Sequence, residues 1–309
     1  MDIHINNSFS IIENKKTKAI AEEIMKIIFL VCAFFAVLAV FSITIYMILN
    51  GTPAIFKIGL KEILFETQWA PTAADPKYGI LYVILTSIVG TTFAVLIGVL
   101  TAVFIAEVAP KQLAAIVKPA VELLAGIPSV IYGLLGIMIL NPFMYKIEKI
   151  IFKGSSTHQF TGGSNLISAI IVLAIMILPT VINISESSIR AVPREMRSAS
   201  LALGASKIQT IFKVVLPVAR SGIMSAIVLG VGRAIGEAMA ITLVSGSSVN
   251  LPLPFNSVRF LTTAIVAEMG YAADEHRQVL FTIGLILFFF IMVVNTVFAK
   301  LLSTNEKAK

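Results

Sequence analysis

Six long stretches of apolar residues alternate with segments that hold nearly all of the charge. A helix of about 20 consecutive apolar residues crosses the hydrocarbon core of a bilayer. The pattern therefore predicts an all-α, polytopic membrane protein with six transmembrane helices. The predicted spans are Ile27–Leu49, Tyr78–Ala106, Pro119–Tyr145, Leu166–Ser185, Leu216–Val244 and Val279–Leu301.

The first stretch is too long for the core of a signal peptide, and Glu13, Glu22 and Glu23 precede it. We therefore expect it to be retained as a membrane helix. This predicts three parts: an N-terminal tail over residues 1–26, a transmembrane domain over 27–302, and a C-terminal tail over 303–309.

Composition agrees with the membrane assignment. Hydrophobic residues make up 57% of the chain and charged residues 13%, against about 25% charged in ordinary soluble domains. The mean hydropathy is +0.94. The net charge of +7 does not indicate nucleic acid, because the basic residues are scattered without interleaved aromatic side chains. The single cysteine, Cys32, excludes an intrachain disulfide, and the three histidines lack the spacing of metal ligands.

The basic residues predict the orientation. With six spans both termini lie on one side, and that side carries 15 Lys and Arg residues against 8 on the other. Basic residues concentrate in cytoplasmic loops. We therefore expect a multi-pass protein of the bacterial or archaeal cell (inner) membrane with both termini in the cytoplasm.

The loop between the fourth and fifth spans, about residues 190–213, supplies most of that bias. It holds five Lys and Arg residues and one acid, Glu195. Pro193 suits a first helical position, Gly204 a left-handed helix end, and Ser206 with Gln209 a capping box. The segment is thus predicted to form two short cytoplasmic helices meeting at a corner, on which a partner can act. Pro217 then falls near the start of the next span.

The fifth span carries intramembrane charge. Small residues recur every four positions from Gly222, a pattern that allows another helix to approach closely. Beside them run Ser225, Arg233 and Glu237, and a continuous helix would place the two charges one turn apart. Charged groups inside a membrane generally mark a transport pathway. The alternative is an ion pair that only holds helices together.

The third span contains a proline among small residues, at Gly126-Ile-Pro128-Ser129. A proline removes one helical hydrogen bond, so this span is predicted to be a kinked helix that lines a passage. The chain contains no Gly-Lys dipeptide and hence no phosphate-binding loop of the Walker type, and it has no G-x-S-x-G or H-E-x-x-H motif. We therefore expect a non-catalytic protein that cannot hydrolyse ATP by itself.

The corner segment resembles the EAA loop of permease subunits in binding-protein-dependent ABC importers. The match runs over Ser198-Ala199-Ser200-x3-Gly204-x9-Val214-x-Leu216-Pro217, with Ser198 in place of the usual glutamate and Ser200 in place of the second alanine. Three further segments resemble phosphate permeases, and the first span with the following outer segment is most similar to the PstC type. These segments are Gly126–Gly133, 232–239 and 261–270.

The resemblance implies a type I importer fold, similar to the MetI-like transmembrane domain. It implies three kinds of partner besides the lipid bilayer: a second permease subunit of the PstA type, a dimeric ATPase of the PstB type that binds ATP and Mg²⁺, and an extracytoplasmic phosphate-binding protein of the PstS type. No cofactor is expected in this chain itself. Arg233 and Glu237 would belong to the translocation route.

Two other functions stay open at this level. Another oxyanion, such as molybdate or sulfate, would suit the same kind of subunit. A proton-coupled secondary carrier could use Arg233 and Glu237 as a relay, although such a carrier has no ATPase to dock on the corner segment.

Overall fold

The structure is a computed structural model that describes residues 2–306, with side chains for 22–110 and 112–300. It divides into two units, residues 1–50 and 51–309. The first unit belongs to one long helix, α1 (Asp2–Ile58), which ends inside the second unit. In the first unit the described apolar side chains of α1 are mostly exposed, as expected for a helix that faces lipid or another membrane helix.

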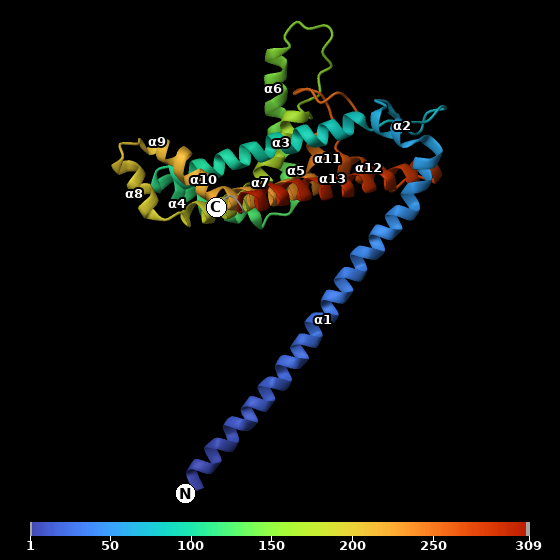
Figure 1. Ribbon diagram of the computed structural model, residues 1–309. Coiled ribbons are helices and arrows are strands. Elements are labelled where there is room, and N and C mark those ends of the chain that lie inside the picture. Colours follow the sequence, from blue (N-terminus) through green and yellow to red (C-terminus); the bar gives the residue numbers. More distant parts are fainter. Residues whose placement is uncertain (1, 307–309) are drawn as a thin grey trace. The chain divides into compact units, whose positions relative to one another are not determined.

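Four long helices form the body of the second unit. They are α3 (Leu81–Val103), α7 (Leu166–Arg190), α10 (Leu216–Gly236) and α13 (Asp274–Glu306). Figure 1 shows them side by side, and α7 packs most extensively against α3 and α10. The main hydrophobic core surrounds α7. Shorter elements connect the long helices and carry the functional features.

On the predicted cytoplasmic side these shorter elements are η1 (Phe104–Val108), α4 (Lys111–Ala125), α8 (Arg194–Ala202), α9 (Lys207–Thr210) and η3 (Ile211–Val215). The others are α2 (Leu60–Phe65), β1 (Trp69–Ala70), β2 (Lys77–Tyr78), α5 (Ser129–Leu135), η2 (Gly136–Leu140), α6 (Asn141–Ile151), α11 (Met239–Val244) and α12 (Leu261–Glu268). Strands β1 and β2 pair antiparallel, with Trp69 opposite Tyr78.

The predicted small-residue stripe is the contact between α10 and α7. A Cβ atom at Gly222 would lie 1.8 Å from Ser188 Oγ, and one at Gly230 would lie 2.8 Å from Val181 Cγ2. Ala226 is fully buried between them. Glycine is therefore required at these two positions for the helices to approach as closely as they do.

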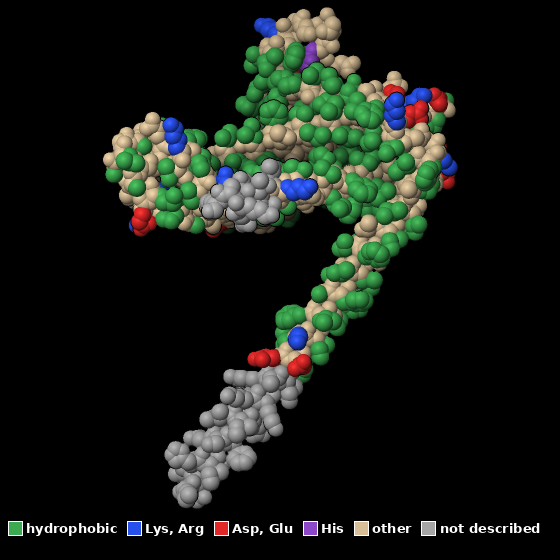
Figure 2. Space-filling view, viewed as in Figure 1, with side chains coloured by type: hydrophobic (Ala, Val, Ile, Leu, Met, Phe, Trp, Pro, Cys, Tyr) green, Lys and Arg blue, Asp and Glu red, His purple; other side chains and the backbone are tan. Residues whose placement is uncertain are grey.

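Six helical segments in the described residues are long and apolar enough to cross a membrane, as predicted. Three of the predicted spans have wrong boundaries. The first continues to Ile58 instead of ending at Leu49, the third is Ser129–Ile151 instead of Pro119–Tyr145, and the fifth is Lys207–Gly236 instead of Leu216–Val244. Figure 2 shows hydrophobic side chains covering the flanks of the long helices, while charged side chains gather near α2 and near the opposite end of the second unit.

Candidate functional site: two helix breaks and an elbow

The third predicted span is broken at its proline. Helix α4 ends at Ala125, and Pro128, with φ −58° and ψ 141°, precedes α5. The prediction of one kinked helix is therefore wrong, because the extended backbone at Pro128 starts a new helix at Ser129. The Tyr132 hydroxyl donates to the Leu124 carbonyl at 2.6 Å. This bond joins the two sides of the break and satisfies a carbonyl at the end of α4.

A second break interrupts the fifth predicted span. Helix α10 ends at Gly236, and Glu237 has extended backbone, with φ −75° and ψ 123°. Its carboxylate Oε1 accepts the Ala240 amide at 3.0 Å, which caps α11, and its carbonyl accepts the Thr262 hydroxyl at 2.8 Å. Glu237 therefore ends α10, and the prediction of a helix that continues through it to Val244 is wrong. Among the described residues no ion pair joins the side chains of Arg233 and Glu237.

The two breaks meet where α5 packs on α11. A Cβ atom at Gly133 would lie 2.6 Å from Leu243 Cδ1 and 2.9 Å from Ala240 Cα. Only glycine permits this approach without displacement of the backbone of α11. The contact brings two interrupted helices, more than a hundred residues apart in sequence, to the same place.

Arg233 lies on the last turn of α10, at the edge of the second break. Its side chain is exposed in this single chain, and it is close enough to Tyr132 for the two groups to interact electrostatically. Ser225 lies two turns earlier on α10, about 12 Å along the axis, and its hydroxyl donates to the Ser221 carbonyl. The structure thus brings Arg233 near the α5 break but leaves Ser225 at a distance.

The predicted cytoplasmic corner forms as expected. Helices α8 and α9 meet at Gly204, whose φ is +82°. Ser206 Oγ accepts the Gln209 amide at 3.2 Å, and Gln209 Oε1 accepts the Ser206 amide at 2.9 Å, which completes the capping box. Pro193 precedes the first helical residue of α8 instead of occupying it, and Pro217 lies in the first turn of α10. We call residues 190–213 the elbow.

Two apolar side chains on the outer surface of the elbow are largely exposed. Leu203 is 89% exposed and Ile208 is 68% exposed. Glu195, Ser198 and Ala199 are also exposed. Such side chains on a polar loop are typical of a surface that a partner covers.

The two serines that replace family residues have different contacts. Ser198 Oγ donates to the Arg194 carbonyl, one turn back in α8, at 3.1 Å. Ser200 Oγ lies 3.0 Å from Thr210 Oγ1 and so joins α8 to α9.

Arg197 links the elbow to the membrane helices, a role that the sequence did not reveal. Its Nη1 donates to both oxygens of Glu107, at 2.8 and 2.9 Å, and its Nη2 donates to the Ile189 carbonyl at 2.8 Å. Glu107 lies in η1, which continues α3, and Ile189 lies near the end of α7. Arg197 therefore joins α8 to the ends of two long helices.

A buried carboxylate on the other side of the membrane domain was also missed. Glu268, 4% exposed at the end of α12, accepts Trp69 Nε1 at 3.1 Å and lies 2.7 Å from His276 Nε2. Arg259 forms an ion pair with the same carboxylate. Together with Glu268 these residues come from four segments, so the cluster ties the β1–β2 hairpin to α12 and α13. The sequence did not reveal this cluster because its members lie far apart along the chain.

The comparisons with known proteins agree with this architecture. Residues 94–305 match the family described as "Binding-protein-dependent transport system inner membrane component". The chain is 37% identical to a probable ABC transporter permease, YqgH, of Bacillus subtilis, over 92% of this chain and 93% of that protein. It is 33% identical to the phosphate transport system permease PstC of Xylella fastidiosa, over 93% of each.

Among solved structures, one of the inward-facing MetNI methionine ABC transporter is similar in fold. It has a TM-score of 0.52 and 19% identity, covering 74% of this chain and 94% of that one. The family match spans both helix breaks and the elbow. This chain is therefore a multi-pass membrane protein that belongs to the family of inner membrane components of binding-protein-dependent transport systems.

Proposed function

We propose that this chain is one of two permease subunits of an ATP-driven importer that carries inorganic phosphate into the cell. The observation that supports it most is the pair of helix breaks at Pro128 and Glu237, which come together where Gly133 contacts Ala240, with Arg233 beside them. Interrupted helices inside a membrane occur where backbone polar groups line a cavity or are buried in protein. We assign phosphate as the substrate because relatives of this chain are named phosphate transport system permeases.

The chemistry of Arg233 suits an oxyanion. Guanidinium presents several N–H donors in a planar fork that matches two oxygens of phosphate, whereas an ammonium acts as a point charge. An isolated arginine at the membrane centre costs about 2.5–3.5 kcal/mol on insertion scales, so it must face a polar cavity. We place Arg233 on the translocation route, together with Pro128 and Ser129 at the α5 break and Ser225 farther along α10.

The elbow couples this route to a partner ATPase that binds ATP and Mg²⁺. Its contact surface consists of the exposed side of α8 and α9, with Glu195, Ser198, Ala199 and Gly204. Ser200 holds the two short helices together, and Pro217 starts the helix that carries Arg233. Closure of the ATPase displaces the elbow, and Arg197 transmits that displacement to α3 and α7. The outcome is alternating access.

The complex that this requires has a second permease of the PstA type, an ATPase dimer of the PstB type, and a phosphate-binding protein of the PstS type. Both termini and the elbow lie in the cytoplasm, because the basic residues concentrate on that side. The segments around α2, β1, β2 and α12 then face the outside.

Transport in vesicles tests the proposal. The assembled complex is reconstituted with ATP on the elbow side, and uptake of labelled phosphate is measured with sulfate or molybdate as competitors. We expect uptake that needs ATP, resists a protonophore, and is displaced by unlabelled phosphate only. Uptake driven by a proton gradient without ATP would establish the secondary carrier instead, and preferred uptake of sulfate or molybdate would establish another oxyanion.

Arg233 provides the sharpest variant in that assay. We expect Arg233→Lys to reduce uptake and Arg233→Ala to abolish it, with the complex still assembled. The charge-swapped pair Arg233→Glu with Glu237→Arg should stay inactive, since no ion pair joins the two in the described structure. Recovery of transport in the swapped variant would show that the charges act only on each other.

A further inference from the structure

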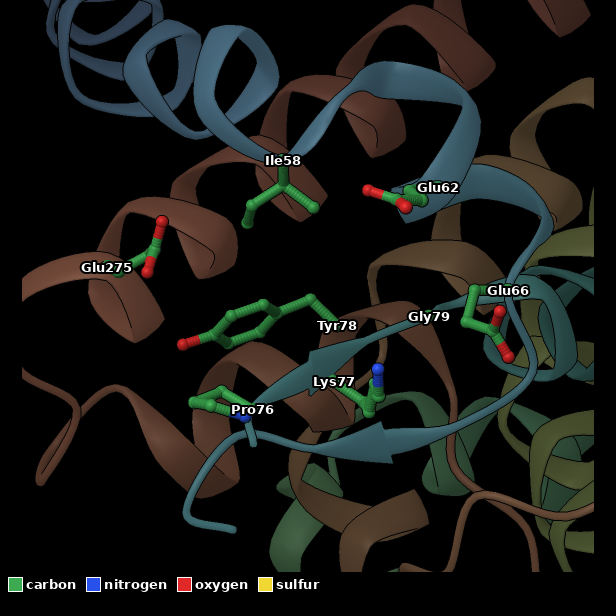
Figure 3. A pocket seen from close by; sticks show the side chains of 8 residues that line it. All are labelled: Ile58, Glu62, Glu66, Pro76, Lys77, Tyr78, Gly79 and Glu275. Carbon is green, nitrogen blue, oxygen red and sulfur yellow. The ribbon is translucent and has the colours of Figure 1, made fainter. Parts of the chain in front are cut away.

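Charged side chains gather at two opposite ends of the second unit (Figure 2). Beside α2, the side chains of Glu62, Glu66 and Lys77 line a small cavity (Figure 3). Lys77 pairs there with Asp75, and both side chains are exposed, so this ion pair adds little stability. The charges near the elbow differ from these, because several of them are partly buried and join separate helices.

One carboxylate near the elbow, Glu186, is shared by two cations. Glu186 lies one turn before the end of α7, and its Oε1 accepts hydrogen bonds from Lys118 Nζ on α4 and from Arg190 Nε on α7. The side chains of Lys118 and Glu186 are 24% and 13% exposed, whereas that of Arg190, the first residue of the elbow, is 70% exposed. The partly buried pair therefore joins α4 to α7, and Arg190 connects the elbow to the same oxygen.

Helix α4 is bounded by extended backbone at both ends. Pro110, which precedes the helix, has φ −56° and ψ 144°, and Pro128, which follows it, has φ −58° and ψ 141°. A proline has a fixed φ and no backbone N–H, so it cannot continue the hydrogen bonds of a preceding helix. Only rotation about ψ is needed there to change the direction of the chain. Helix α4 is thus a rigid segment between two hinges.

The position of α4 between these hinges depends on one polar contact. Its apolar face packs on the main core through Val121, which is buried, and through Ala114, Val117 and Leu124. Hydrophobic contacts are non-directional, so they allow a helix to slide or tilt. Among the described side chains of α4, only Lys118 has a hydrogen bond to another helix. Because a charge-assisted hydrogen bond is short and directional, this contact fixes the register of α4 on α7.

We propose that α4 is a gate helix at the elbow-side end of the translocation route, and that Lys118 and Glu186 are the residues that position it. This rests on the proposed function, in which the elbow displaces the end of α7. Because Glu186 lies on that end, α4 follows α7 through the ion pair and turns about Pro110 and Pro128. The hinge at Pro128 is the helix break near Arg233. A swing of α4 therefore opens or closes the route beside that arginine.

Phosphate uptake and ATP hydrolysis, measured together in vesicles that contain the complete transporter, test this proposal. We expect Lys118→Gln to lower the amount of phosphate transported per ATP by about 5- to 30-fold, because α4 loses its one polar contact with α7. Lys118→Arg keeps a cation for Glu186 and should retain most of the coupling. Lys118→Gln combined with Glu186→Gln should lose no more than Glu186→Gln alone, since both residues act through one contact. The matched control, Lys153→Gln, removes an exposed lysine outside α4 and should leave the ratio unchanged.

Pulsed electron paramagnetic resonance measures the movement of α4 directly. Cys32 is the single cysteine of this chain, so Cys32→Ser, with cysteine-free partner subunits, gives a background for two spin labels. The labels are attached at Ala120→Cys on α4 and Ile150→Cys on α6, which are exposed positions. We expect the distance between the labels to change when a non-hydrolysable ATP analogue closes the ATPase. In Lys118→Gln this change should be lost, even where the variant assembles normally.

Two results would overturn the proposal. One is a normal amount of phosphate transported per ATP in Lys118→Gln together with lower thermal stability, which would make the ion pair a purely structural contact and leave the proposed function standing. The other is a change in label distance that is the same in wild type and in Lys118→Gln. Transport of a different oxyanion by the wild-type complex, with the label distance still dependent on Lys118, would contradict the proposed substrate and support the gate helix.

Discussion

The left-handed corner at Gly204 permits a quantitative test of the elbow. Replacement by valine introduces a side chain where φ is +82°, and the added Cβ would meet nothing within 4 Å. The cost is therefore conformational and not steric. A left-handed backbone costs an L-residue about 1–2 kcal/mol, and a β-branched residue falls at the upper end. A change of that size reduces the fraction of correctly bent elbow roughly 5- to 30-fold.

The assay is ATP hydrolysis by the reconstituted complex, stimulated by the phosphate-loaded binding protein. We expect Gly204→Val to lower the stimulated rate by about the same 5- to 30-fold. The amount of protein in the membrane should not change, because the corner is exposed and packs against nothing. Gly204→Asn is the matched control, since asparagine tolerates the left-handed conformation, and it should retain most of the stimulation.

Two results would refute this reasoning. Full stimulation in Gly204→Val would show that the bend is not required for coupling. Equal loss in the valine and asparagine variants would show that the side chain itself obstructs the ATPase, independently of backbone conformation.

Three further predictions follow from the other contacts. Arg197→Ala should lower the free energy of unfolding by about 1.5–3 kcal/mol, because it leaves the buried Glu107 carboxylate without its partner. Thermal denaturation measures this loss, and adding Glu107→Gln should restore part of the stability. No rescue by Glu107→Gln would show that the ion pair does not account for the loss. Gly133→Ala should lower the free energy of unfolding by about 1–3 kcal/mol, because the added methyl group overpacks α5 against α11, and it should impair transport more than assembly. Normal phosphate uptake by this variant would show that the two helix breaks are not part of the translocation route. Glu237→Gln keeps an acceptor oxygen for the Ala240 amide and removes the negative charge. We therefore expect uptake of sulfate to rise relative to uptake of phosphate. An unchanged ratio of phosphate to sulfate uptake would show that the only role of Glu237 is to cap α11.

Local sequence was sufficient for the membrane helices and for the elbow. Apolar length decides whether a helix spans a bilayer, and this property depends only on consecutive residues. The elbow is equally local, because Gly204 supplies the left-handed turn and Ser206 with Gln209 caps the following helix within three residues. The Gly126–Pro128 break was foreseen only as a kink. Proline signals an interruption, but the sequence does not say whether the chain bends or starts a new helix.

The break at Glu237 was decided by tertiary structure. No proline marks it, and the pattern from Gly222 to Ala238 favours one continuous helix, which led to the wrong prediction of a fifth span that continues to Val244. The extended backbone there is held by the hydroxyl of Thr262, and α11 is packed against Gly133.

The Glu268 cluster has the same origin. Trp69 and Glu268 are 199 residues apart in the sequence. Each of these residues has an ordinary local context, so no window of sequence distinguishes it. A carboxylate acquires a partner, or lacks one, only when distant segments pack together. For that reason the sequence determined which segments cross the membrane, while the fold decided where the charges meet.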